Sequence, residues 1–317
     1  MRFAPIRHVP LMFVLAIAAP VPAAEGQDHA SAVSESDRAP SVFADGVISN
    51  ENEQWRISFT RDGSVAYFAE SAEFFPASRR ATIYRSELRG GVWTVPVVAS
   101  FSGEYSDIDP FISPDGKRLY FSSIRPVNGQ VRGDIDLWMV ERRGDDWGEP
   151  VHLGPEVNTE ADELYPSASA DGTLYFASGP QSLVRGKHFD IYSAKRSGSG
   201  FLMRQLLGPG VNTVPADSDP HLQAAWEFNP EVSADGRTLF FTSLRPGGFG
   251  LGDLYVSRLV GSEWTAAVNV GPIVNTAADE YHPTVSPDGT QLFFVRRRPA
   301  RGNFYRIPIA ALEVLNR

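Results

Sequence analysis

One short turn motif occurs five times in the chain, and this repeat constrains the fold more than any other feature. Each copy has a serine or threonine, one variable residue, and then Asp-Gly. Successive copies are 53, 56, 64 and 53 residues apart, as counted between Asp62, Asp115, Asp171, Asp235 and Asp288. Repeats of this length are typical of propellers and solenoids, in which each unit buries its apolar faces against its neighbours.

Three further segments recur around each Asp-Gly. An apolar, aromatic run such as Leu119-Tyr120-Phe121 follows the glycine, and a run such as Asp190-Ile191-Tyr192 comes later. A fourth segment opens with an aromatic residue: Trp93, Trp147, Phe201 or Trp264. Aromatic and β-branched residues favour strands, and Asp-Gly supplies the positive φ that a tight hairpin needs. Each unit therefore predicts a sheet of four antiparallel strands.

The two ends of the repeat region complement each other. The fifth unit stops after its third strand, near Ile307, and residues 41–49 resemble the Leu-Gly-Pro-x-Val-Asn segment at 153–158. An N-terminal strand would complete the last blade and remove both free sheet edges. The sequence predicts an all-β, five-bladed β-propeller of four-stranded antiparallel blades, closed by that strand. Six blades is the alternative, and we expect the excess between Ser178 and Ala225 to be a surface loop instead.

The hairpins, the aromatic strands and the Asp-Ile-Tyr type strands resemble the WD40-like PD40 repeat, also called the TolB-like propeller. The resemblance covers roughly residues 41–310. The chain is similar to the stand-alone exported members of that family. This resemblance implies an extracytoplasmic propeller that binds a protein or a ligand, and it implies no single reaction because the fold hosts many functions.

The N-terminal segment has the pattern of a cleavable signal peptide. Arg2 and Arg7 precede an apolar stretch that is too short to span a membrane, and small residues follow up to Ala24. We therefore expect residues 1–24 to be a signal peptide, an uncleaved interfacial helix being the alternative. Residues 25–40 are predicted to be a flexible linker and residues 41–317 the propeller. The expected location is the periplasm or the exterior.

Charge and cysteine content exclude several classes of function. The net charge is −9 without a long basic run, which argues against nucleic acid as a partner. The chain has no cysteine, which removes disulfides, thiolate zinc sites and a lipid-modified N-terminal cysteine. We predict no cofactor and no metal site, because the histidines lack the spacing of metal ligands.

The strand before each Asp-Gly turn is innermost by resemblance to the family. Its first residues carry an acid in four units: Asp107, Glu163, Glu227 and Glu280. Two positions later the units diverge, to Arg56, Asp109, Tyr165, Asn229 and His282. Two positions further on, the fourth unit has Glu231. Strict alternation would place the last two sets on one strand face, at the mouth of the central channel.

Each set has two interpretations. The repeated acids could form a pocket for a cation, an amine or a sugar, or they could cap loop amides and pair with arginines. Repetition favours the structural interpretation, because a reaction needs asymmetry. The diverging set suits recognition of a polar ligand or peptide, and its alternative is buried water and hydrogen bonding between blades.

We expect an exported, non-catalytic propeller that binds a protein or an envelope ligand, such as a glycan, through one face. The alternative is a carbohydrate-active hydrolase or lyase that uses carboxylates at the channel mouth. Asp109, Glu227 and Glu231 are the acids to test for it, and the sequence assigns no catalytic residue.

Overall fold

The five Asp-Gly turns form five hairpins. The computed structural model describes residues 38–181, 188–214, 225–297 and 301–315. In every turn the aspartate accepts a hydrogen bond from the serine or threonine hydroxyl two residues earlier, at 2.5–2.6 Å. The same carboxylate accepts the backbone N–H two residues later, at 2.9–3.1 Å. The turn glycines have φ between 69° and 84°, which only glycine adopts without strain.

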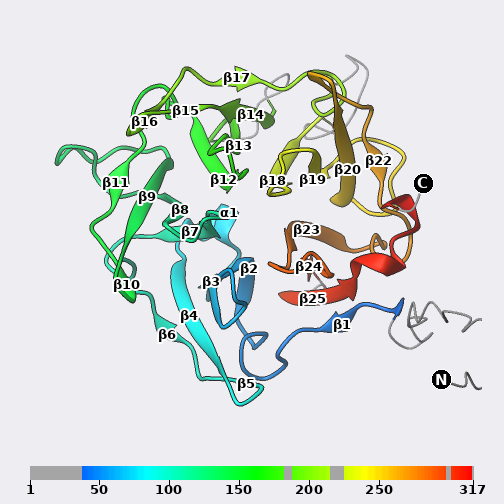
Figure 1. The fold of residues 1–317 in the computed structure, drawn as a ribbon, viewed down its shortest axis with the longest axis horizontal. Coiled ribbons are helices and arrows are strands. Elements are labelled where there is room, and N and C mark those ends of the chain that lie inside the picture. The colour runs from blue at the N-terminus through cyan, green and yellow to red at the C-terminus, as the bar shows by residue number, and fades with distance from the viewer. Residues whose placement is uncertain (1–37, 182–187, 215–224, 298–300, 316–317) are drawn as a thin grey trace, which may run out of the picture. The chain divides into compact units, whose positions relative to one another are not determined.

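Each hairpin joins the first two strands of an antiparallel blade (Figure 1). The first blade contains β2 (Glu53–Phe59), β3 (Val65–Ser71), β4 (Thr82–Arg89), β5 (Val92–Trp93) and β6 (Val97–Val98). The second contains β7 (Asp107–Ile112), β8 (Arg118–Ser123), β9 (Asp136–Arg143), β10 (Asp146–Trp147) and β11 (Val151–His152). The third contains β12 (Asp162–Ala168), β13 (Leu174–Gly179), β14 (Asp190–Ala194) and β17 (Gln205–Leu206).

The remaining elements complete the ring. The fourth blade contains β18 (Glu227–Val232), β19 (Thr238–Ser243), β20 (Asp253–Val260), β21 (Glu263–Trp264) and β22 (Val268–Asn269). The fifth contains β23 (Asp279–Val285), β24 (Gln291–Arg297), β25 (Gly302–Pro308) and β1 (Ser41–Val42). Outside the blades are the ribbon of β15 (Arg196–Ser197) and β16 (Gly200–Phe201), α1 (Phe75–Ser78), η2 (Ile309–Ala311) and η3 (Glu313–Leu315).

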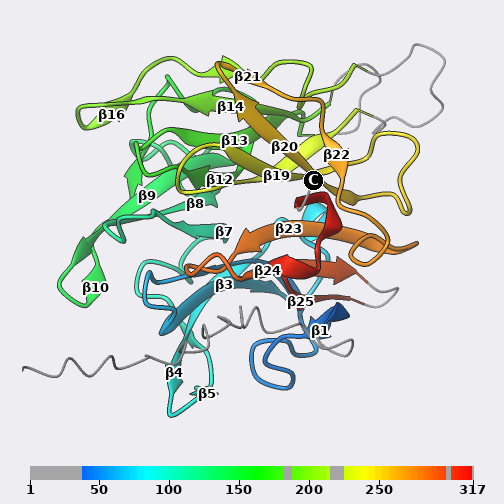
Figure 2. The same ribbon diagram turned by 45° about the vertical axis from the view of Figure 1, so that its right-hand side comes forward.

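The N-terminal strand closes the ring, as predicted. β1 pairs with β25, with Ser41 opposite Arg306, and the Phe43 N–H donates to the Phe304 carbonyl at 2.9 Å. The first and last blades also meet at the inner strands, where the Thr284 hydroxyl donates to the Ile57 carbonyl at 2.8 Å. Figure 2 shows β1 beside β25 from a second direction. The five-bladed, all-β prediction is confirmed.

The core lies between neighbouring blades. At three junctions an aromatic residue from the fourth segment packs against a tyrosine of the preceding blade. The centroid distances are 6.0 Å for Trp147 on Tyr67, 6.5 Å for Phe201 on Tyr120 and 6.1 Å for Trp264 on Tyr175. These aromatic contacts explain why the fourth segment opens with a large ring although its strands have only two residues.

Several sequence predictions fall outside the described residues. The proposed signal peptide lies there, as do most of the proposed linker and residues 182–187 and 215–224 of the long third unit. Within the ranges that are described, no helix is long and apolar enough to cross a membrane.

Candidate functional site

The four repeated acids at the starts of the inner strands are buried and fully engaged. Glu163 accepts hydrogen bonds from the Thr159 N–H and hydroxyl, both at 2.8 Å, and from the Ser178 hydroxyl at 2.7 Å. Glu227 has the equivalent bonds to Thr213 and Ser243. Asp107 and Glu280 are also completely buried, and their carboxylates accept hydrogen bonds from neighbouring residues.

An arginine completes each of these four networks. The arginine nitrogen lies 2.7–3.1 Å from the acid in the pairs Arg125–Asp107, Arg204–Glu163, Arg245–Glu227 and Arg296–Glu280. Each guanidinium also bonds a backbone carbonyl, on Phe101, Val157, Val211 or Val274. It lies over the ring of a third-strand aromatic, which is Trp138, Tyr192, Tyr255 or Tyr305, at 4.5–5.7 Å from the centroid. We call this arrangement of acid, carbonyl and ring an arginine socket.

The arginine sockets give the repeated acids a structural role. Burial raises the pKa of Asp107, Glu163 and Glu280, while their hydrogen bonds and the arginines act in the opposite direction. A buried carboxylate that already has three or more donors has little capacity left for a ligand. The contacts are those of the structural interpretation, in which the acids cap loop amides and pair with arginines.

The first blade departs from this pattern. Its inner strand has Gln54 where the others have an acid, and the acid stands opposite, at Glu70 of β3. The Glu70 carboxylate accepts hydrogen bonds from the Asn50 amide at 2.7 Å and the Asn52 amide at 2.8 Å. Sequence reasoning missed Glu70, although comparison of the five units shows serine or arginine at the equivalent place in the other four.

An arginine crosses the centre of the ring. Arg56 of β2 forms an ion pair with Glu231 of β18, which belongs to a blade that is not adjacent to the first, and donates to the Pro230 carbonyl at 3.1 Å. Arg56 is completely buried. Burial raises the pKa of Glu231 to about 7, and the attraction to Arg56 opposes this shift. This ion pair occupies the axis at that level.

A second group of polar side chains surrounds the pair. The His282 Nδ1 lies 3.1 Å from the Asn229 amide nitrogen and 3.6 Å from an Asp109 oxygen. Burial lowers the pKa of His282 well below its usual value, so the imidazole is neutral and Nδ1 accepts from Asn229. Neither Asp109 oxygen makes a hydrogen bond of good geometry among the described residues. Burial raises the Asp109 pKa to about 7, opposed by Arg56.

The prediction of strict alternation along the inner strands is wrong. A β-bulge interrupts each of these strands, for example between Leu164 and Ser167 of β12. At the bulge Asp109, Tyr165, Asn229 and His282 have φ of 52–62°, and each precedes a proline. This conformation costs a non-glycine residue roughly 1–3 kcal/mol. The bulge shifts the phase of the strand, so in the second to fifth blades the second residue of each predicted pair no longer shares the face of the first.

The residues beyond the bulge link neighbouring blades. The Ser58 hydroxyl accepts the Ile112 N–H at 2.9 Å, and the Ser167 hydroxyl accepts the Val232 N–H at 3.3 Å. Glu231 accepts the Val285 N–H at 3.1 Å. These residues therefore form hydrogen bonds between blades, which is the structural alternative that the sequence analysis gave for them.

The loop that contains α1 lies over the centre of the ring (Figure 1). Arg79, which follows α1 in the first blade, binds both oxygens of Asp162 in the third blade, at 2.9 and 3.1 Å. Phe75 of α1 packs on Trp55, which neighbours His282. This loop and the Arg56–Glu231 pair place Asp109 and His282 in the interior of the protein. Only Tyr165 of the central set is partly exposed.

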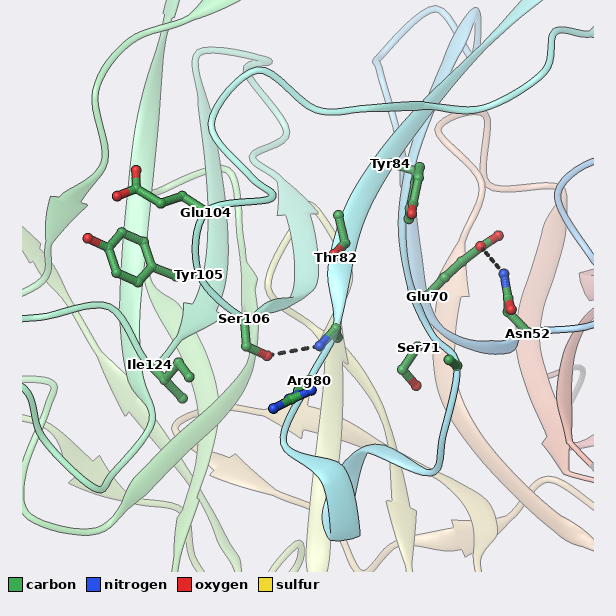
Figure 3. A pocket seen from close by; sticks show the side chains of 12 residues that line it. Asn52, Glu70, Ser71, Arg80, Thr82, Tyr84, Glu104, Tyr105, Ser106 and Ile124 are labelled. Atoms are coloured by element: carbon green, nitrogen blue, oxygen red, sulfur yellow. Dashed lines mark hydrogen bonds between the residues drawn. The ribbon is translucent and has the colours of Figure 1, made fainter.

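An open groove lies between the first and second blades on the same face as these loops. Its volume is about 500 Å³. Figure 3 shows its two walls, which are formed by the ends of β3 and β4 on one side and by the loop before β7 on the other. The lining side chains include Glu70, Tyr84, Arg80, Glu104 and Tyr105. Arg80 and Glu104 are exposed, so this groove presents charged and aromatic groups to solvent.

The described part of the chain contains no group of three or more histidines and acids that could hold a metal ion. The site residues that the structure brings together at the centre are Arg56, Asp109, Tyr165, Asn229, Glu231 and His282. Asp107, Glu163, Glu227 and Glu280 lie apart from one another, each in its own blade. The groove was not predicted from the sequence.

Fold and site together define a five-bladed β-propeller with a filled centre. No family model and no curated protein matches the chain. Among solved structures it is similar to α-L-arabinofuranosidase from Lactobacillus brevis, with 17% identity, 84% of this chain and 94% of that chain covered, and a TM-score of 0.52. Endo-arabinase from Bacteroides thetaiotaomicron has 11% identity, coverages of 83% and 96%, and a TM-score of 0.53.

TolB from Acinetobacter baumannii is also a structural neighbour. It has 15% identity, a TM-score of 0.48 and 81% of this chain covered, and the chain spans 54% of that protein. At these identities the similarities show the β-propeller fold alone, because one fold supports many functions. Membership of the PD40 family stays a prediction from the repeat.

Proposed function

We propose that this protein is an exported, non-catalytic propeller that binds a partner protein through the groove between its first and second blades. The observation that carries the proposal is the contrast between the two candidate sites. The acids around the ring are buried and bonded internally, whereas the groove presents Arg80, Glu104 and Tyr105 at an open surface. Binding residues on loops over a rigid scaffold are the common arrangement.

Export is part of this proposal and rests on the sequence pattern of residues 1–24. A partner would then be an envelope or extracellular protein. A polar envelope ligand such as a glycan is the other occupant that a groove of this composition suits.

A carbohydrate-active hydrolase or lyase is the second candidate. The fold shared with the α-L-arabinofuranosidase and the endo-arabinase is the reason to test it. Glycoside hydrolysis needs two carboxyl groups that both reach the substrate. Asp109 and Glu227 are exposed by 0% and Glu231 by 5%, which favours binding over hydrolysis. Turnover on a polysaccharide panel that is lost in folded D109A and E231A would support catalysis.

The binding proposal is tested by filling the groove. Ala72 is exposed at its edge, and Ala77 is an exposed alanine of α1 outside it. A72W should lose a protein that the wild type captures from an envelope extract, and the matched control A77W should keep it. Loss of that purified partner by A72W in a direct binding assay would confirm the groove. Equal capture by both variants would contradict the proposal.

A further inference from the structure

The first blade contains the parts of an arginine socket without an arginine. In the third, fourth and fifth blades the second-strand and third-strand rings stack, as in Phe176–Tyr192 at 6.1 Å and an interplanar angle of 21°. Phe68 and Tyr84 repeat this pair at 6.3 Å and 25°. Among the described residues no guanidinium lies over the Tyr84 ring, although one lies over each equivalent ring.

The missing side chain has an identifiable place in the sequence. Ser123 and Ser243 pair with the inner acids, and the socket arginines Arg125 and Arg245 follow two residues later. In the first blade Glu70 holds the serine position, so the corresponding residue is Ala72. Ala72 lines the groove. The groove is therefore open where an arginine side chain stands in the second and fourth blades.

The socket does not depend on one route of entry. In the third blade the arginine comes from before β17, as Arg204, and in the fifth it belongs to β24, as Arg296. The guanidinium nevertheless reaches the same acid and ring in all four blades. The position is favoured by its surroundings, so a guanidinium from another molecule can satisfy it too.

Glu70 supplies the negative charge for such a guest. Glu70 is 7% exposed and lines the groove together with Tyr84, and its carboxylate bonds Asn52 at the edge of the groove (Figure 3). Two asparagine amides use two of its roughly four acceptor sites. Among the described residues no arginine or lysine nitrogen lies within 4.0 Å of this carboxylate, unlike the acids of the other four blades.

We propose that the groove is an open arginine socket, which binds the guanidinium group of an arginine side chain on the partner. This inference rests on the proposed function and adds the chemistry of recognition. A planar guanidinium can stack on Tyr84 while it donates to Glu70, as the internal arginines do in their blades. An ammonium group has no plane to stack, so lysine fits this site less well.

The first test uses the peptide acetyl-Gly-Arg-Gly-amide with calorimetry. Replacing arginine by neutral citrulline should weaken binding at least about tenfold, because the charge-assisted bond is lost. E70Q should weaken arginine-peptide binding to a similar degree, whereas D145N, at an exposed carboxylate in the loop between β9 and β10 and outside the groove, should change it by less than about twofold. Y84L provides a second lesion if E70Q fails to fold. Equal affinity for the arginine and citrulline peptides would overturn the socket.

Free arginine is compared with the peptide to distinguish the source of the guanidinium. Tighter binding of the peptide places the group on a polypeptide. Equal affinity keeps the guanidinium socket and makes a small guanidine the ligand. Arg80 lies at the same groove, and R80A should bind the peptide more tightly than the wild type, because it removes a positive charge that repels the guanidinium. Loss of peptide binding in R80A would move recognition to Arg80 and overturn the inference.

The second test fills the socket from within. A72R restores the arginine of the second and fourth blades, so it should raise the melting temperature and abolish peptide binding. Unchanged peptide binding by A72R would refute the socket. The partner assay separates the two proposals. If A72W no longer binds the partner but E70Q and A72R bind it as the wild type does, the proposed function is supported and the guanidinium inference is refuted.

Discussion

Asp109 should make the protein less stable as the pH rises, and D109N should remove that effect. Asp109 is completely buried, and burial raises its pKa from 3.8 to about 7 in the folded protein. Between these values the folded state holds a proton that the unfolded state has released, so the contribution of Asp109 to stability is most favourable below pH 4 and falls as the pH rises to 7. A pKa shift of about three units lowers the free energy of unfolding above pH 7 by about 4 kcal/mol relative to its value below pH 4.

The assay is urea unfolding of wild type and D109N at pH 5 and pH 8. The variant should gain more stability over the wild type at pH 8 than at pH 5, because asparagine carries no charge at either pH. The groups that face Asp109 are Arg56, His282, Tyr165 and Ser122. His282 has the opposite pH dependence, since its neutral form is favoured by burial, and it is present in both proteins.

A matched control isolates the buried group. Asp145 is an exposed carboxylate in the loop between β9 and β10. D145N should shift stability by less than about 0.5 kcal/mol at both pH values. Parallel pH profiles for wild type and D109N would refute the conclusion that burial raises the pKa of Asp109 at the centre of the ring.

Three further predictions concern the ring. Deletion of residues 41–49 should lower the melting temperature, because it removes β1 and its bonds to β25; an unchanged value would contradict ring closure. The double change D288A/G289A should cost about 1–3 kcal/mol in denaturant unfolding, through the lost Ser286 bond and a strained φ of 72°. R56M should lower stability by about 3–5 kcal/mol at pH 8, since it leaves Glu231 buried without its cation, and by less at pH 5, where Glu231 is protonated.

The repeat predicted the fold because its information is local. Asp-Gly turns and aromatic strands have the same meaning in each unit, and residues 41–49 had a recognisable partner segment. The centre was harder to predict. The bulges broke the alternation on which the site residues were aligned, and the four residues before proline were the available sign of them.

Other site features depend on distances across the ring. The pairing of Arg56 with Glu231 joins blades that are not adjacent, and no spacing in the sequence encodes it. Ala72 and Glu70 were visible in principle, by comparing Glu70-Ser71-Ala72 with Ser123-Ile124-Arg125 and Ser243-Leu244-Arg245. The comparison could not be interpreted from the sequence, because only the structure shows that Arg125 and Arg245 bind the buried acids.

The closure of the ring by pairing of β1 with β25 has a consequence for folding kinetics. Most strand pairs join neighbours in sequence, but the Ser49 hydroxyl and the Phe304 carbonyl are separated by 255 residues. Non-local contacts of this kind slow folding, because a long loop must be ordered before the contact forms. The last blade can therefore assemble only after the whole repeat region has been synthesised. A circular permutant that joins β25 to β1 through a short linker and opens elsewhere would convert this step into a local one and fold faster.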